Sequence, residues 1–343
     1  MKISKWRIIL LSSLNFFVYL PSKILLRKDM EYIYLLLCLV AIVFSADWLV
    51  AGAVTIAKRF KISDFVIGAV IVGVGTSFPE LVVSSIGAFN GNADIAIGNV
   101  VGSNIFNVLG ILGLTAIITP VAVSRDNKRF DLPFCIGASI ITLLLALNFF
   151  MGGEAGISRI DGLILLALFA FFMYNSLKSN KKQEDTSDEV VTNKQLLFGI
   201  VKVVLGLATL IISSRFFLDN VILIAKAWGV NEAFIAITLV ACGTSLPELA
   251  ASLVAAAKKN TQLALGNVIG SNIFNLTLIL GAASQITPLT SSGITAVDYA
   301  VMLFAGTAPL LLGFKGKLNR WAGAFLFLCF VAYNAYLISS QMS

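Results

Sequence analysis

GTSFPELVVSS at residues 75–85 and GNVVGSNIFNVLGILG at 98–113 recur later in the chain as GTSLPELAASL at 243–253 and GNVIGSNIFNLTLILG at 266–281. The shift between the two copies is a constant 168 residues, and 22 of the 39 aligned positions are identical. Unrelated apolar helices share leucines and valines, but they do not share glycine, proline, glutamate and asparagine at fixed spacing. The chain therefore contains an internal duplication.

The composition places both copies in a lipid bilayer. Of the 343 residues, 58% are hydrophobic and 13% are charged, whereas a soluble domain carries about 25% charged residues. A bilayer-crossing helix needs about 20 mainly apolar residues. The sequence predicts ten such spans, at 31–54, 62–89, 93–118, 133–150, 160–177, 195–221, 233–257, 261–284, 296–314 and 321–340.

The residue types that are missing exclude several kinds of chemistry. The chain has no histidine, which removes Ser-His-Asp and Cys-His catalytic pairs and histidine metal sites. Its four cysteines are scattered through apolar stretches, so we predict neither a disulfide framework nor a zinc site. We therefore expect no cofactor and no enzymatic activity.

Lysine and arginine in the loops predict the orientation. If the first span begins outside, the cytoplasmic loops contain fifteen of these residues, and the opposite side contains only Arg159 and Lys226. Because cytoplasmic loops are enriched in positive charge, both ends of the ten-helix unit are predicted to lie outside a plasma (inner) membrane. The net charge of +7 then reflects topology, and we predict no nucleic-acid partner and no obligatory protein partner.

The chain divides into two halves around a polar linker. Residues 30–177 form a first five-helix repeat and 196–343 a second, joined by a cytoplasmic linker at 178–195. Five is an odd number, so the second repeat enters the membrane the opposite way up. Residues 1–29 form an N-terminal extension that fits a signal-like segment, an extra span or a stretch upstream of a start at Met30. The predicted fold is an all-α membrane protein of ten transmembrane helices, built as two inverted five-helix repeats with broken helices at the core.

Oxygen-bearing side chains gather at the two predicted helix breaks. Pro79 removes a helical hydrogen bond, as Pro247 does in the second copy. Glu80 follows the first proline and Glu248 the second, so each copy carries one carboxylate within an apolar span. In each copy, helical spacing places two hydroxyls on the face of the glutamate and two further oxygens on one face of the span that follows. They belong to Thr76, Ser77, Ser103 and Asn107, and to Thr244, Ser245, Ser271 and Asn275.

This set of ligands suits hard cations. Ca²⁺ takes about six to eight oxygen ligands, and neither nitrogen nor sulfur is needed. A buried acidic residue is costly within a membrane, and a bound cation would offset that cost for Glu80 and Glu248. Their two negative charges match one Ca²⁺ or two Na⁺. Asp47 and Arg215, which also differ by 168 residues, are interpreted as a helix-end or gating-helix pair rather than as ion ligands.

On these motifs the chain resembles the sodium/calcium exchanger family of the cation/Ca²⁺ antiporter superfamily. The resemblance covers residues 30–343 and implies four ion sites at the broken second, third, seventh and eighth helices. It further implies that Glu80 and Glu248 are shared by Ca²⁺ and Na⁺, and that backbone carbonyls near Gly73 and Ala241 complete outer Na⁺ sites. Asn275 departs from branches of the family that carry aspartate there, which argues against potassium co-transport and against a proton held at that position.

The leading hypothesis is therefore a secondary antiporter that exchanges Na⁺ for Ca²⁺ at a midplane site. A Ca²⁺/H⁺ exchanger, or another divalent cation exchanger on the same fold, is the alternative. An intramembrane hydrolase using Ser77 or Ser103 would lack a histidine partner and leaves the duplication unexplained. A passive channel would show no acceleration by a counter-ion.

Overall fold

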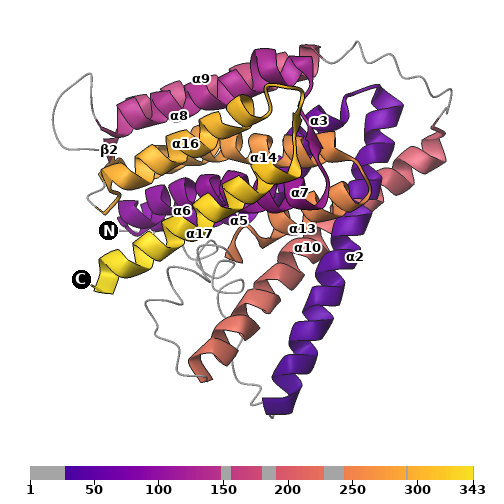
Figure 1. The fold of residues 1–343 in the computed structure, drawn as a ribbon, viewed down its shortest axis with the longest axis horizontal. Coiled ribbons are helices and arrows are strands. Elements are labelled where there is room, and N and C mark those ends of the chain that lie inside the picture. The colour runs from indigo at the N-terminus through magenta and orange to yellow at the C-terminus, as the bar shows by residue number, and fades with distance from the viewer. Residues whose placement is uncertain (1–27, 148–155, 180–190, 228–242, 291–292, 343) are drawn as a thin grey trace, which may run out of the picture.

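The fold is seen in a computed structural model of the chain (Figure 1). It describes residues 28–147, 156–179, 191–227, 243–290 and 293–342. Most of the predicted N-terminal extension, part of the linker and the predicted ligand Ala241 lie outside the described residues.

Helices form nearly all of the described structure. The first half contains α2 (Lys28–Phe60), α3 (Asp64–Ile67), α4 (Val74–Thr76), α5 (Phe78–Phe89), α6 (Ala93–Ile105), α7 (Gly113–Ile118), α8 (Leu132–Ala146) and α9 (Arg159–Ser179). The second contains α10 (Asn193–Ala227), α13 (Leu246–Ala257), α14 (Thr261–Phe274), α15 (Leu280–Ile286), α16 (Ala296–Leu312) and α17 (Arg320–Met342). Wider π-helical turns interrupt them at η1 (Gly68–Gly73), η2 (Phe106–Leu112), η3 (Asn127–Asp131) and η5 (Asn275–Ile279).

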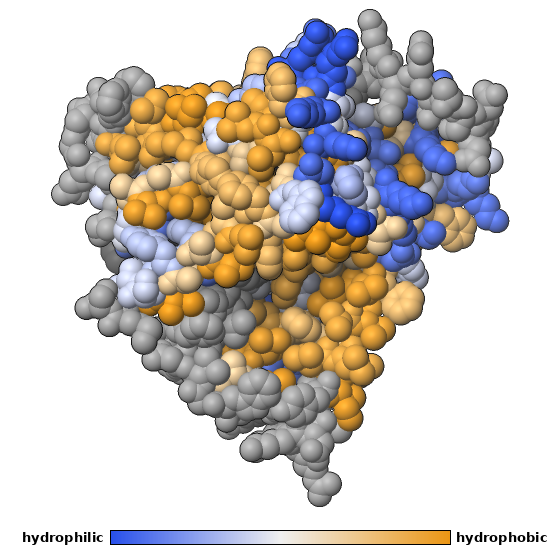
Figure 2. All heavy atoms as spheres, viewed as in Figure 1, coloured by the Kyte–Doolittle hydropathy of each residue, from blue (hydrophilic) through white to orange (hydrophobic). Residues whose placement is uncertain are grey.

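The helices account for a multi-pass membrane protein. Seven helices in the described ranges are long and apolar enough to cross a membrane. The bent pair Asp64–Thr76 and Phe78–Phe89, which meet at 46°, adds an eighth span when taken as one. α13 and α16 are apolar but shorter. Figure 2 shows a broad apolar surface with hydrophilic residues gathered at one end, as expected of a protein surrounded by lipid.

Several helices extend beyond the predicted boundaries. α2 runs from Lys28 to Phe60 rather than from 31 to 54, and α9 ends at Ser179 within the predicted linker. α10 begins at Asn193, also within that linker. The cause at α10 is a capping box, in which Gln195 accepts from the Thr192 backbone N–H and Thr192 Oγ1 accepts from the Gln195 N–H.

Four two-residue strands, absent from the all-helical prediction, tie loops together. β1 (Val121–Ala122) pairs antiparallel with β4 (Lys317–Leu318), and β2 (Gly156–Ile157) pairs antiparallel with β3 (Leu289–Thr290). Each pair joins a loop of the first half to a loop of the second. Strand pairs this short connect the loops to each other but do not alter the helical fold.

Two sets of helices position the core. α2 and α10 pack along each other more extensively than any other pair of described elements, and Figure 1 shows them running obliquely across the remaining helices. α14 lies almost fully buried inside the molecule. Glycine permits this burial, because a Cβ on Gly266 would overlap the backbone carbonyl of Phe65 and one on Gly270 would overlap Ala69. The core thus brings η1 of the first half against α14 of the second.

Candidate cation site

Two helices begin inside the protein, and each carries one predicted glutamate in its first turn. α5 starts after Ser77 and α13 starts after Ser245, with Pro79 and Pro247 in their second positions. Proline is well suited to a helix start, where its missing N–H is not needed. The prolines therefore begin new helices rather than interrupt continuous ones, and a helix N-terminus favours a negative charge nearby.

The glutamates are joined across the two halves by crossed hydrogen bonds. Ser77 Oγ donates to Glu248 Oε1 at 2.7 Å. Ser245 Oγ donates to Glu80 Oε1 at 2.8 Å. All four side chains are completely buried. Each serine thus precedes the glutamate of its own helix and contacts the glutamate of the other helix.

Several buried oxygens near these bonds have no hydrogen-bond partner among the described residues. They are Glu80 Oε2, Glu248 Oε2, Asn107 Oδ1, Asn275 Oδ1 and Ser103 Oγ. A buried polar atom without a partner is costly unless water or an ion satisfies it. All five belong to residues that the sequence predicts as cation ligands.

A second layer of asparagines holds the glutamate backbones. Asn99 Nδ2 donates to the carbonyl oxygen of Glu80 at 3.2 Å and to Ser84 Oγ at 3.0 Å. Asn267 Nδ2 repeats both contacts, with the carbonyl oxygen of Glu248 at 3.1 Å and with Ser252 Oγ at 2.9 Å. Neither asparagine was predicted as part of the site, although both stand beside a glycine in the duplicated motif.

Four further asparagines link the two halves beside the π-helical turns. Asn107 Nδ2 donates to Asn272 Oδ1 at 3.0 Å, and Asn275 Nδ2 donates to Asn104 Oδ1 at 3.2 Å. Asn272 Nδ2 also donates to the Asn104 carbonyl oxygen at 3.2 Å. Asn107 lies in η2 and Asn275 begins η5, and π-helical turns are frequent at functional sites. The role of Asn104 and Asn272 was not predicted.

Three of the remaining predicted ligands, Thr76, Ser77 and Ser271, contact the carbonyl of Gly73. This oxygen accepts from the Ser77 N–H at 3.0 Å and from Ser271 Oγ at 3.3 Å. Thr76 Oγ1 lies 3.0 Å from the Val72 carbonyl oxygen and 3.3 Å from Asn267 Oδ1. Thr244 and Thr76 lie beside Glu80 and Glu248, respectively.

The site contains few charges. Among the described residues, no group of three or more histidine, cysteine, aspartate or glutamate side chains could hold a metal ion. Two carboxylates, amides and hydroxyls therefore supply the candidate ligands.

Asp47 and Arg215 do not form a pair with each other. Asp47 Oδ1 lies 2.6 Å from Lys258 Nζ, whereas Arg215 Nε lies 3.5 Å from Asp219 Oδ2 within α10. Although the two positions are related by the 168-residue shift, their side chains form ion pairs with other residues, Asp47 with Lys258 and Arg215 with Asp219.

Comparison with known proteins gives this arrangement a family. The family model described as sodium/calcium exchanger protein matches residues 30–178 and 198–339, one stretch in each half of the chain. The chain belongs to the sodium/calcium exchanger family. The unmatched residues between the two stretches fall within and just beyond the predicted linker.

Individual exchangers and antiporters resemble almost the whole chain. The putative antiporter CaxA of Alkalimonas amylolytica is 37% identical over 321 residues, covering 90% of this chain and 98% of CaxA. The sodium/calcium exchanger MaX1 of Methanosarcina acetivorans is 32% identical over 343 residues, with coverage of 90% and 98%. The sodium-calcium exchanger NCX_Mj, in a structure soaked with Na⁺ and without Ca²⁺, superposes with a TM-score of 0.79 at 32% identity, covering 90% of this chain and 98% of NCX_Mj. As a member of this family, the chain is a membrane antiporter. The relatives named above are transporters rather than enzymes.

Proposed function

We propose that the chain is a secondary antiporter that exchanges Na⁺ for Ca²⁺ by alternating access at an oxygen-lined site near the membrane midplane. The observation that carries this proposal is the set of unpartnered buried oxygens on Glu80, Glu248, Ser103, Asn107 and Asn275. Hard cations such as Ca²⁺ and Na⁺ bind carboxylate, amide and hydroxyl oxygens of this kind.

The two glutamates are proposed to bind both ions in turn. Each presents one oxygen held by a serine and one oxygen without a partner. Thr76, Ser77, Ser103 and Asn107 with Thr244, Ser245, Ser271 and Asn275 would complete the ligand set, together with the carbonyls of Gly73 and Ala241. Two carboxylates balance one Ca²⁺ or two Na⁺, so both loads leave the buried site nearly neutral.

Charge balance also explains why exchange would be coupled. An empty site leaves two buried carboxylates uncompensated, which is strongly unfavourable in a low-dielectric interior. A site occupied by Ca²⁺ or by Na⁺ has its carboxylates neutralised. The protein can then switch the site from one side of the membrane to the other. The packed pair α2 and α10 is proposed to slide over the remaining helices during that change, so transport in one direction requires a return with the other ion.

The proposed architecture supplies the two access states. We infer ten spans arranged as two inverted repeats, 30–177 and 196–343, with the linker 178–195 in the cytoplasm and both ends of the ten-helix unit outside the plasma (inner) membrane. Inverted repeats place their shared site at the interface between them. The crossed contacts of Ser77 and Ser245 support this location, because each joins one half to the other.

The proposal is tested by Ca²⁺ uptake into proteoliposomes under imposed ion gradients. We expect an outwardly directed Na⁺ gradient to drive ⁴⁵Ca²⁺ uptake, and Glu80→Gln or Glu248→Gln to reduce it to the background of empty vesicles. Asp126→Asn, which removes an exposed carboxylate outside the site, should leave uptake unchanged. Normal uptake by both glutamine variants would contradict the proposed site.

The same carboxylates provide the one observation that favours Ca²⁺/H⁺ exchange, because an unpartnered buried carboxylate oxygen can also accept a proton. A pH gradient imposed without Na⁺ separates the two functions. Uptake that follows the pH gradient and ignores Na⁺ would establish the alternative.

A further inference from the structure

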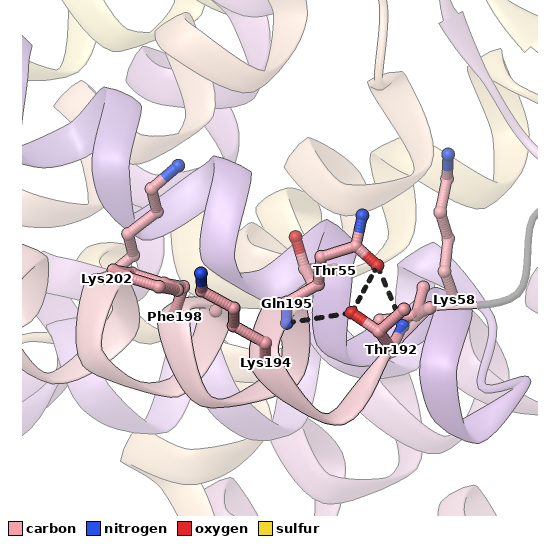
Figure 3. Close-up of a pocket in the computed structure, with 9 residues that line it drawn as sticks. Thr55, Lys58, Thr192, Lys194, Gln195, Phe198 and Lys202 are labelled. Carbon is pink, nitrogen blue, oxygen red and sulfur yellow. Dashed lines mark hydrogen bonds between the residues drawn. The ribbon is translucent and has the colours of Figure 1, made fainter.

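A groove of about 450 Å³ lies between the last turns of α2 and the first turns of α10 (Figure 3). It is separate from the buried glutamates and opens at the end of the molecule where hydrophilic residues gather in Figure 2. Its lining includes Thr55 and Lys58 of α2 and Lys194, Gln195, Phe198 and Lys202 of α10.

The packing of the two helices forms the groove. Glycine brings the backbones together below it, because a Cβ on Gly52 would lie 2.5 Å from the carbonyl oxygen of Gly199. Towards the helix ends, Arg59 Nη2 donates to Asn193 Oδ1 at 3.4 Å and bridges α2 to α10. The groove therefore spans two helices that are fixed to each other on either side of it.

The groove is positively charged. Lys58, Lys194 and Lys202 are exposed, and none of the described residues that line the groove is acidic. Figure 3 shows the three lysine side chains extending to the same side of the two helices. The N-terminus of the 35-residue helix α10 adds a partial positive charge. This combination favours an anion.

The surroundings indicate that the anion is part of a lipid. Lys202 follows Phe198 by one helical turn within an apolar part of α10, so its aliphatic stem must carry the ammonium group towards the membrane surface. Phe198 itself is 57% exposed, and Leu197, Val201 and Leu205 continue this exposed apolar surface along α10. A soluble anion would use only the lysines, whereas a phospholipid would also cover these apolar side chains.

We propose that this groove binds the phosphate-bearing headgroup of an anionic phospholipid, with its acyl chains along the exposed side chains of α10. Basic pockets between transmembrane helices at the cytoplasmic side have the chemistry that binds such headgroups. The bound lipid links Lys58 of α2 to Lys194 and Lys202 of α10. Binding does not depend on which cations are exchanged, whereas any effect on the sliding of α2 and α10 rests on the proposed function.

Native mass spectrometry of the purified full chain tests the proposal, with phosphatidylglycerol and phosphatidylcholine of identical acyl chains as probes. We expect the protein to retain one phosphatidylglycerol with about tenfold preference over phosphatidylcholine. Lys194→Gln combined with Lys202→Gln should abolish this preference. The matched control, Lys315→Gln with Lys317→Gln, removes two exposed lysines outside the groove and should preserve it. Lys194→Arg with Lys202→Arg should also preserve it, which separates loss of charge from loss of fold.

Three results would overturn the proposal. One is equal retention of the two lipids by the unmodified chain, and another is an equal loss of preference in the control variant. The third is displacement of phosphatidylglycerol by inorganic phosphate at equimolar concentration, which would show that the groove is a site for a soluble anion.

Discussion

The two copies of the duplicated motif share their principal polar contacts but are packed differently. Asn99 and Asn267 each hold the backbone of the glutamate in their own copy. Yet Asn267 is completely buried and Asn99 is only half-buried. The same contrast holds along the helices, since the span Thr261–Ile286 is more deeply buried than Ala93–Ile118.

The difference shows that the polar contacts of the motif and the burial of the motif depend on different residues. Side chains inside the motif determine which polar groups meet, and these contacts recur at the 168-residue shift. The neighbours of each copy determine how tightly it is enclosed, and here α14 packs against α3 through Gly266 and against η1 through Gly270. Two like repeats in unlike environments are what the proposed alternating access requires, because identical environments would leave both sides of the membrane equivalent.

The largest expected difference concerns glycine. Gly266→Ala would force a Cβ into the backbone carbonyl of Phe65, and overpacking of this kind typically costs about 1–3 kcal/mol. Its counterpart Gly98 is half-buried and would meet the tip of Ile294 at 3.3 Å among the described residues. We therefore expect Gly266→Ala to lower the midpoint of thermal unfolding and Gly98→Ala to leave it nearly unchanged.

Thermal unfolding of the purified variants in one detergent measures this contrast. Equal losses of stability would contradict the packing difference between the copies. Gly98→Ala could instead keep its stability and lose transport. This outcome would refine the packing difference, because it would indicate that the first copy becomes tightly packed only in the other access state.

A smaller difference is expected for the asparagines. Asn267 is completely buried and its Oδ1 also lies 3.3 Å from Thr76 Oγ1, whereas Asn99 is only half-buried. Loss of a buried hydrogen bond leaves its partner unsatisfied, whereas water can replace one at a half-buried position, and this difference is about 1 kcal/mol. Asn267→Leu should therefore weaken the apparent affinity for Ca²⁺ roughly fivefold more than Asn99→Leu. The concentration dependence of ⁴⁵Ca²⁺ uptake measures both.

Asn175→Leu is the control for this comparison, because its amide bonds only to a carbonyl of its own helix α9. An unchanged affinity in Asn267→Leu would show that this residue does not position Glu248. A common effect of all three variants would point to expression or folding rather than to the site.

The sequence predicted those features of the site that the duplication controls directly. Glu80 and Glu248 were expected to lie together because the repeat places them at equivalent depths, and the structure brings them to one cluster. The crossing of Ser77 to Glu248 could not be predicted, because spacing along one helix gives no information about the opposite helix. Asn104 and Asn272 were missed for a related reason, since their partners lie across the interface and π-helical turns shift the faces of α6 and α14.

The smallest expected effect comes from an ion pair between the two halves that has no counterpart at the positions related by the 168-residue shift. Lys258 Nζ contacts Asp47 Oδ1 at 2.6 Å and links α13 to α2, while position 90, equivalent to 258, is an uncharged asparagine. The two side chains are 37% and 49% exposed, so water and salt screen the pair and we expect about 0.2–1 kcal/mol of coupling. A double-mutant cycle of Asp47→Asn and Lys258→Gln, followed by thermal unfolding at low and high salt, measures it. Coupling that disappears at high salt would identify a surface contact, whereas a larger coupling that persists would mean that the pair is enclosed and restrains α2 against α13. The latter result would locate a further asymmetry between the halves at the helix that we propose to slide.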